Sequence, residues 1–175
     1  MPALHPHPAS PHDGISAIHV DVIPGARRLQ LHYHLDGDIA RLRIPASSEP
    51  ARATGLWRHT CFEAFLLRPS STEYLEYNFS PSGDWAAYRF AAYRQGMTDL
   101  IEGAAPLIAR RADASSLTVA VTLDLDWLQD SFDSLRLGLT AVIEDRAQVL
   151  SYWALKHASE KPDFHRAECF VAALA

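Results

Sequence analysis

Carboxylate and amide side chains occur between residues 57 and 94 inside runs that are otherwise apolar and aromatic. Glu63, Glu76 and Asn78 each stand in such a run, where a strand that only built a core would carry apolar residues. Sugar rings present apolar C–H faces that stack on aromatic rings, and their hydroxyls need hydrogen-bonding groups in fixed places. The segment therefore predicts a small-ligand site, with a saccharide as the first candidate.

The residues expected to bind this ligand have either an aromatic ring or a hydrogen-bonding side chain close to a polar loop. They are Trp57, Glu63, Glu76, Asn78, Trp85, Arg89, Trp153, Lys161, Asp163 and His165. Each also has a structural interpretation: tryptophans fill cores, Glu76 could form an ion pair with Arg89, and Asp163 with His165 could brace the last strand. For the set as a whole, we adopt the ligand site.

Catalytic templates are absent from the sequence, which has no GxSxG, P-loop, GxGxxG or HExxH motif. Glu63 and Glu76 could form a glycosidase-like pair, one as the acid and the other as the nucleophile or base. Sequence spacing does not fix the separation of their carboxyl groups. We therefore expect a non-catalytic binding protein, with an unrecognised glycoside hydrolase-like enzyme as an alternative.

Histidines are frequent but show no zinc-finger spacing. Several lie in the proline-rich residues 1–14, which we interpret as an irregular N-terminal arm. His32 and His34 are two residues apart on an expected strand and could form a metal corner, but the solvated face of a half-buried sheet is the simpler interpretation. We expect no bound metal and no cofactor.

The composition is that of a water-soluble domain, with 48% hydrophobic and 21% charged residues. A net charge of −5 argues against nucleic acid or an anionic membrane as a partner, and no apolar run reaches the roughly 18 residues of a membrane span. The first residues lack the basic start and apolar core of a secretory signal, so we expect a cytoplasmic protein. The sequence does not identify a protein partner. Cys61 and Cys169 lie in apolar runs, which favours buried, reduced thiols.

Short strands must position these residues. Apolar alternation and Pro, Gly and Ser breaks predict strands near 15–23, 29–35, 39–44, 61–67, 74–79, 85–93, 107–112, 117–123, 135–143, 149–154 and 164–174. A loop or short helical segment is expected after Met97, and one helical turn at 125–128, capped by Asp124 or Asp126. We predict an all-β, single-domain antiparallel β-sandwich over residues 15–175, jelly-roll or immunoglobulin-like, with about ten strands and one or two short helical turns.

At these residues the chain resembles bacterial DOMON-like proteins, a group related to family 9 carbohydrate-binding modules. The likeness lies in Trp57 followed six residues later by Glu63, in YLEYNFSPSGDWAAYRF at 74–90, and in KPDFH at 161–165. It spans about Ile15 to Leu174, and it implies a jelly-roll-like β-sandwich that binds a sugar or a haem and usually does no chemistry.

In sugar-binding relatives tryptophans flank the sugar above polar strand residues. Trp57, Glu63 and Asn78 match that pattern, and Trp153 matches it loosely. Thr60 stands where those relatives often carry Asp three residues before the strand glutamate, so the loop and any bound calcium would differ here. Those modules are typically secreted, whereas this chain shows no secretory signal, so a soluble saccharide or sugar-containing metabolite fits it better than extracellular polysaccharide.

Haem-binding relatives use a methionine with a histidine or lysine as axial ligands. The resemblance makes Met97 and His165 the axial ligands of the alternative, with His59, Lys156 and His157 also available as partners of Met97 by residue type. The haem b would be bound without covalent attachment because no CxxCH motif is present. A methionine beside Gly96 is also an ordinary loop residue.

Overall fold

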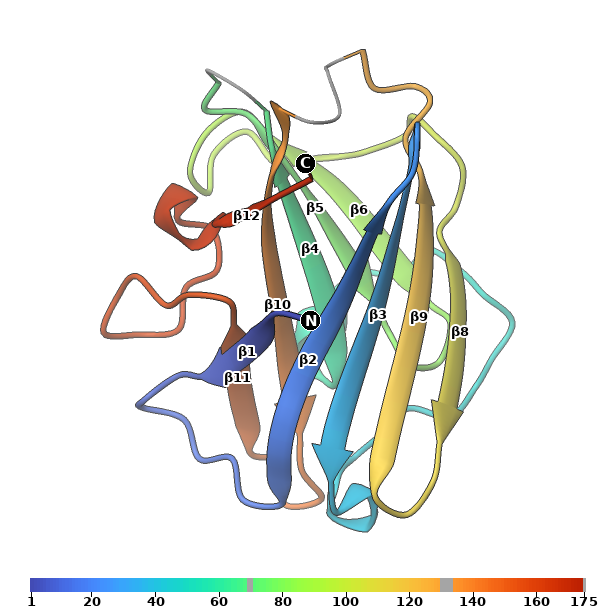
Figure 1. Ribbon diagram of the computed structural model, residues 1–175, viewed down its shortest axis with the longest axis vertical. Coiled ribbons are helices and arrows are strands. Elements are labelled where there is room, and N and C mark those ends of the chain that lie inside the picture. Colours follow the sequence, from blue (N-terminus) through green and yellow to red (C-terminus); the bar gives the residue numbers. More distant parts are fainter. Residues whose placement is uncertain (69–70, 130–133, 175) are drawn as a thin grey trace.

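The computed structural model describes residues 1–68, 71–129 and 134–174, and these residues are mostly β-strand (Figure 1). The strands are β1 (Ala3–Pro6), β2 (Ile15–Pro24), β3 (Arg28–Gly37), β4 (Cys61–Leu67), β5 (Tyr74–Phe79), β6 (Trp85–Phe90), β7 (Thr98–Asp99), β8 (Leu107–Ala112), β9 (Ser116–Asp124), β10 (Arg136–Glu144), β11 (Leu150–Ala154) and β12 (Ala172–Ala173). Short 3-10 helices are η1 (Ile39–Arg41), η2 (Leu56–Arg58) and η4 (Ala167–Cys169). None of the helices in these residues has the length and apolarity to cross a membrane.

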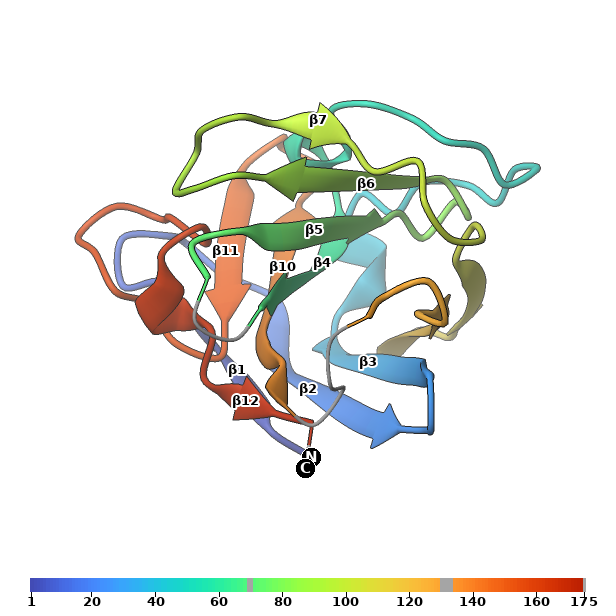
Figure 2. The same cartoon turned by 90° about the horizontal axis from the view of Figure 1, so that it is seen from above.

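The strands form one antiparallel sheet that folds back on itself into two facing layers (Figures 1 and 2). The first layer contains β2, β3, β9 and β8, and the second contains β11, β10, β4, β5, β6 and β7. The short strand β1 pairs with β2 on one side and with β11 on the other, so it joins the layers. The predicted all-β antiparallel sandwich is therefore confirmed.

Alternation along the first layer works as the sequence predicts. Leu29, Leu31 and Tyr33 are fully buried against the second layer, whereas His32 and His34 are half-buried on the outer face. A strand sends successive side chains to opposite faces, so one face of β3 builds the core and the other meets solvent.

The second layer is buried on both faces, which explains why its strands read as continuous apolar runs. One face packs into the core between the layers through residues such as Phe62 and Phe79. The opposite face carries Phe65 and Tyr74, and it is covered by the segment that follows β11, including Phe170. The bounds of β4 and β5 coincide with the predicted runs. A site on this outer face therefore borders the covering segment.

Two predictions about the N-terminal half of the chain are wrong. The arm over residues 1–14 is not irregular throughout, because Ala3–Pro6 forms β1 and Leu4 is buried. Residues 39–44 do not form a strand: Asp38 accepts a hydrogen bond from the Ala40 N–H and caps η1, and Leu42 makes only an isolated bridge to Asp145. In both places side-chain capping or a distant strand decided the local structure.

One further prediction fails later in the chain, and others succeed. Residues 164–174 form η4 and the two-residue β12 instead of one long strand, because their aromatic side chains cover the sheet. After Met97 the chain forms the two-residue strand β7 and then a loop, so of the two alternatives the loop is found and the helical segment is not. The turn at 125–128 is confirmed, with the Asp126 N–H donating to Asp124 Oδ1 at 3.1 Å. Both cysteines are free and buried, as expected.

Candidate functional site

A cavity of about 640 Å³ opens on the covered face of the second layer. Strand residues from β4, β5, β6, β10 and β11 line it, and η2, the loop after β6 and residues 162–165 complete it. The lining residues are Trp57, Arg58, Glu63, Glu76, Tyr88, Phe90, Arg94, Met97, Val142, Leu150, Tyr152, Pro162, Phe164 and His165. Pockets that bind small molecules have this character, a mostly apolar wall with a few convergent polar groups.

Strand register brings the polar residues of the floor together. Glu63 on β4 lies directly opposite Asn78 on β5, and Thr140 on β10 lies opposite Glu63 from the other side. Glu76 stands two residues before Asn78 and so projects from the same face of the sheet. Three of the sequence-predicted site residues therefore meet on one face of the sheet. Glu63 and Glu76 line the cavity, whereas Asn78 is fully buried and does not line it.

Hydrogen bonds hold both glutamates in place. The Thr140 hydroxyl donates to Glu63 Oε2 at 2.8 Å, and Asn78 Nδ2 donates to Glu76 Oε1 at 2.6 Å. Glu63 is 3% exposed and Glu76 is 5% exposed. Buried carboxyl groups are rare unless each has a partner of this kind.

Burial also controls the charge of these glutamates. Burial first, and then the neighbouring Glu76 carboxylate, raise the pKa of Glu63 to about 8. Burial raises the pKa of Glu76 as well, although the Asn78 hydrogen bond and the charge of Arg94 oppose this rise. Two carboxyl groups that are buried in one site do not ionise together easily. At neutral pH the floor therefore offers a carboxylic acid donor, Glu63, beside Glu76.

His165 extends the polar floor from the C-terminal segment. The Arg94 backbone N–H donates to the Tyr74 hydroxyl oxygen at 3.2 Å, so the hydroxyl hydrogen is free to be donated to His165 Nδ1, 2.8 Å away. Burial and the charge of Arg94 lower the pKa of His165 to about 4. A neutral ring with Nδ1 as acceptor carries its hydrogen on Nε2, which lies 3.9 Å from Glu76 Oε2.

Asp163 braces the wall of the cavity without lining it. Arg94 donates to Asp163 Oδ1 from Nη2 at 2.9 Å and from Nε at 3.3 Å, and the Tyr93 hydroxyl donates to Oδ2 at 2.5 Å. Burial opposes ionisation of Asp163, but these hydrogen bonds have the larger combined effect and lower the pKa of Asp163. Arg94 has a φ of 51°, in the left-handed region that non-glycine residues rarely adopt. Asp163 thus holds a strained arginine at the edge of the cavity.

Aromatic and apolar side chains form the rim. Trp57 is 40% exposed although it is a large apolar residue, and its ring lies edge-on to Tyr88 with centroids 6.3 Å apart. Met97 also lines the cavity and is 56% exposed. An indole that stays accessible at a cavity mouth is available to stack on a ligand.

The structure places Trp85 and Arg89 away from the cavity. Alternation along β6 sends both to the face opposite Tyr88, which pairs with Glu76 in the ladder. The Arg52 guanidinium covers the Trp85 ring at 4.1 Å from its centroid, and Arg89 bonds to Glu102. The ion pair considered between Arg89 and Glu76 is therefore not formed.

Trp153 and Lys161 are also outside the cavity lining. Trp153 is 3% exposed in the core between the layers, where its Nε1 donates to the Ser151 hydroxyl at 3.0 Å. Lys161 is exposed on the loop that leads to Pro162. The tryptophan thus has the structural role that was weighed against ligand binding.

The sequence prediction missed Arg94 as a lining residue. Tyr88 and Tyr152 belong to the aromatic residues near polar loops and also line the cavity, although the list of expected ligand-binding residues omits them. Alternation could have found Tyr88, because it shares a face with Phe90 and not with Trp85. Arg94 lies beyond the end of β6 in a tight turn, and it reaches the cavity through its bond to Asp163. No local sequence pattern predicts this contact between Arg94 and Asp163.

Met97 and His165 line the same cavity, as the haem alternative requires. The floor beneath them fits haem poorly, because an apolar macrocycle would cover the carboxyl groups of Glu63 and Glu76 without offering them hydrogen bonds. The Tyr74 hydroxyl also holds one nitrogen of His165. A hydroxyl-rich ligand suits these groups better.

No protein-family model and no curated protein matches the chain. Among solved structures, the chain is similar in fold to a putative carbohydrate-binding protein from Bacteroides uniformis ATCC 8492, with 16% sequence identity and a TM-score of 0.59. The match covers 89% of this chain and 78% of the other. At this identity the likeness shows a shared fold.

Proposed function

We propose that this protein binds a saccharide or a sugar-containing metabolite in the cavity and does not transform it. The observation that carries the proposal is the accessible indole of Trp57 at the rim of a cavity whose floor holds Glu63 and Glu76. The indole stacks on the apolar face of a sugar ring. The floor supplies a donor from the Glu63 acid and acceptors from Glu76 for the hydroxyls.

Two further facts support this proposal. The cavity volume of about 640 Å³ lies within the range of small-molecule sites, roughly 300–1,000 Å³. The Bacteroides uniformis protein that shares the fold is itself described as a putative carbohydrate-binding protein. The shared fold suggests the class of ligand, and the side chains that line the cavity identify the residues that would bind it.

A glycoside hydrolase is the second candidate, because one cavity contains both glutamates and the pKa of one of them is about 8. Glycosidases keep one carboxyl group protonated as the acid while another serves as nucleophile or base. Binding without turnover is our first choice because the Thr140 and Asn78 side chains occupy an oxygen of each glutamate.

The test titrates the purified protein with a panel of mono- and disaccharides and records tryptophan fluorescence and binding heat. We expect at least one sugar to bind, and Trp57→Ala to weaken its binding by about tenfold, or ~1.4 kcal/mol. Ile101→Ala is the matched control, because Ile101 is 83% exposed and lies outside the cavity lining. Binding that Trp57→Ala leaves unchanged, or a panel without any binder, contradicts the proposal.

Two added measurements separate the alternatives. Hydrolysis of chromogenic glycosides that disappears in Glu63→Gln would assign the cavity to an enzyme. A Soret band that forms with hemin and is lost in Met97→Ala would assign it to haem.

A further inference from the structure

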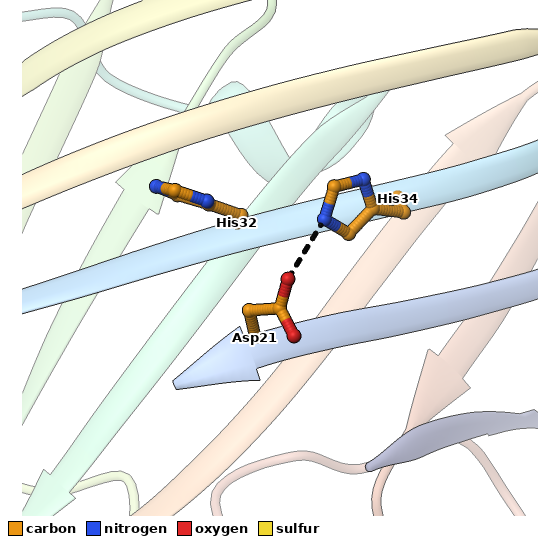
Figure 3. Close-up of side chains that lie close together, drawn as sticks. All are labelled: Asp21, His32 and His34. Atoms are coloured by element: carbon orange, nitrogen blue, oxygen red, sulfur yellow. Dashed lines mark hydrogen bonds and ion pairs between the residues drawn. The ribbon is translucent and has the colours of Figure 1, made fainter. Parts of the chain in front are cut away.

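The outer face of the first layer brings together three side chains that can bind a metal ion: Asp21, His32 and His34 (Figure 3). One ligand atom from each lies within 4.8 Å of those of the other two. Asp21 comes from β2 and the histidines come from β3, so two neighbouring strands supply the group. It lies on the opposite layer from the cavity and is independent of the proposed function.

Strand pairing fixes this arrangement. Asp21 lies directly opposite His32 in the β2–β3 ladder. His32 and His34 are separated by Tyr33, whose side chain is fully buried in the core. Because side chains alternate, burial of Tyr33 forces both histidines outward on the same face. Metal sites built on paired strands of this kind hold their ligands on a rigid support.

Hydrogen bonding already orients one of the imidazoles. His34 Nδ1 lies 3.3 Å from the Thr118 hydroxyl on β9, and His34 Nε2 lies 3.2 Å from Asp21 Oδ2. A metal-binding histidine usually holds its second ring nitrogen against such an outer partner, which fixes the tautomer and the ring direction. Thr118 stands in that position, and Nε2 faces the carboxylate.

We propose that Asp21, His32 and His34 bind a divalent first-row transition cation, with Zn²⁺ as the expected ion. Two imidazoles and a carboxylate are a donor set that Zn²⁺ accepts, with a further position left for water. All three side chains are half-buried, so the ion can enter from solvent. Calcium and magnesium are disfavoured because they prefer oxygen ligands.

An ion pair between Asp21 and His34 is the competing explanation for their contact. That pair uses no atom of His32, whereas the metal site requires His32. The role of His32 therefore distinguishes the two explanations.

The experiment titrates the full-length chain, without a polyhistidine tag, with ZnCl₂ by calorimetry and with Co²⁺ by visible absorption. We expect one ion per chain and a Co²⁺ ligand-field spectrum. His32→Gln and His34→Gln should each weaken binding by at least about tenfold, since even the loss of an outer partner costs about 10–100-fold. His19→Gln is the matched control: His19 lies opposite His34 in the ladder but does not belong to the group of three.

Circular dichroism and thermal unfolding of the metal-free variants establish that each one folds, as expected for half-buried outer-face residues. Three outcomes would overturn the proposal. The first is that neither ion binds to the folded protein. The second is that binding survives in His32→Gln, which would place the ion elsewhere, for instance on the N-terminal histidines. The third is that His19→Gln loses as much affinity as His34→Gln.

Discussion

Replacing Glu63 by glutamine should make the protein more stable at alkaline pH. The pKa of Glu63 is 4.5 in its ordinary state and about 8 in the fold, so between these values the folded protein holds a proton that the unfolded chain has lost. The stabilisation that comes from this retained proton is fully present below pH 4.5. It is lost progressively as the pH rises from 4.5 to about 8. Each pH unit in this interval costs about 1.4 kcal/mol, a total of about 5 kcal/mol.

Glutamine imitates the neutral acid and has no charge to desolvate. Its carbonyl oxygen can also accept the hydrogen bond that Thr140 donates to Glu63 Oε2. We therefore expect the two proteins to have similar stabilities at pH 4.5. The advantage of Glu63→Gln should then grow to about 5 kcal/mol by pH 8.5.

The assay is urea unfolding at half-unit pH steps, analysed as the difference between variant and wild type. The difference is needed because the pKa of His165 falls from 6.5 to about 4 in the fold. That shift makes stability rise with pH between 4 and 6.5 in both proteins. Glu160→Gln, at an exposed position, controls for the loss of one negative charge. A difference that stays flat from pH 5 to 8.5 would refute the reasoning about the cavity floor.

Two further predictions concern the segment that covers the outer face of the second layer. Asp163→Asn should destabilise the protein by about 1–2 kcal/mol at pH 7 in urea unfolding, because charged hydrogen bonds from Arg94 are lost; the effect should fade below pH 3.8, as wild-type Asp163 becomes protonated. Gly138→Ala should cost about 1–3 kcal/mol, since a Cβ there would lie 2.5 Å from Phe170 Cδ1. The double variant with Phe170→Leu should recover part of that loss, and a fully stable Gly138→Ala would count against tight packing of the covering segment.

Residue patterns predicted the sheet well where local signals and tertiary packing agree. The alternation of Leu31 and Tyr33 with His32 describes β3 correctly, and the turn residues around β4 and β5 marked their ends. The residues from 164 to 174 resemble a strand because they are apolar, yet Phe170 covers a sheet instead of extending one. An apolar run indicates that a segment is buried, but it does not indicate which element the segment packs against.

The candidate site could be predicted in part for the same reason. Glu63, Glu76 and Asn78 stand out because polar residues in buried runs need an explanation, and the register then brings them together. Trp85 and Trp153 were assigned by residue type alone, and their positions along the strands place them on other faces. Assigning alternate residues of each strand to opposite faces of the sheet would have excluded both tryptophans from the site.

The short strand β1 has a consequence for how the protein folds. It joins the two layers, and its His5 pairs with Ala154 of β11. Some paired strands are near neighbours in sequence, as β2 and β3 or β4 and β5 are, but each layer also contains one distant pairing, β3 with β9 and β4 with β10. Contacts between distant residues form more slowly than local ones. We therefore expect the hairpins β2–β3 and β4–β5 to form early and the distant pairings, among them β1 with β11, to form late. Amide hydrogens bonded between β1 and β11 should then gain exchange protection later during refolding than those bonded between β2 and β3.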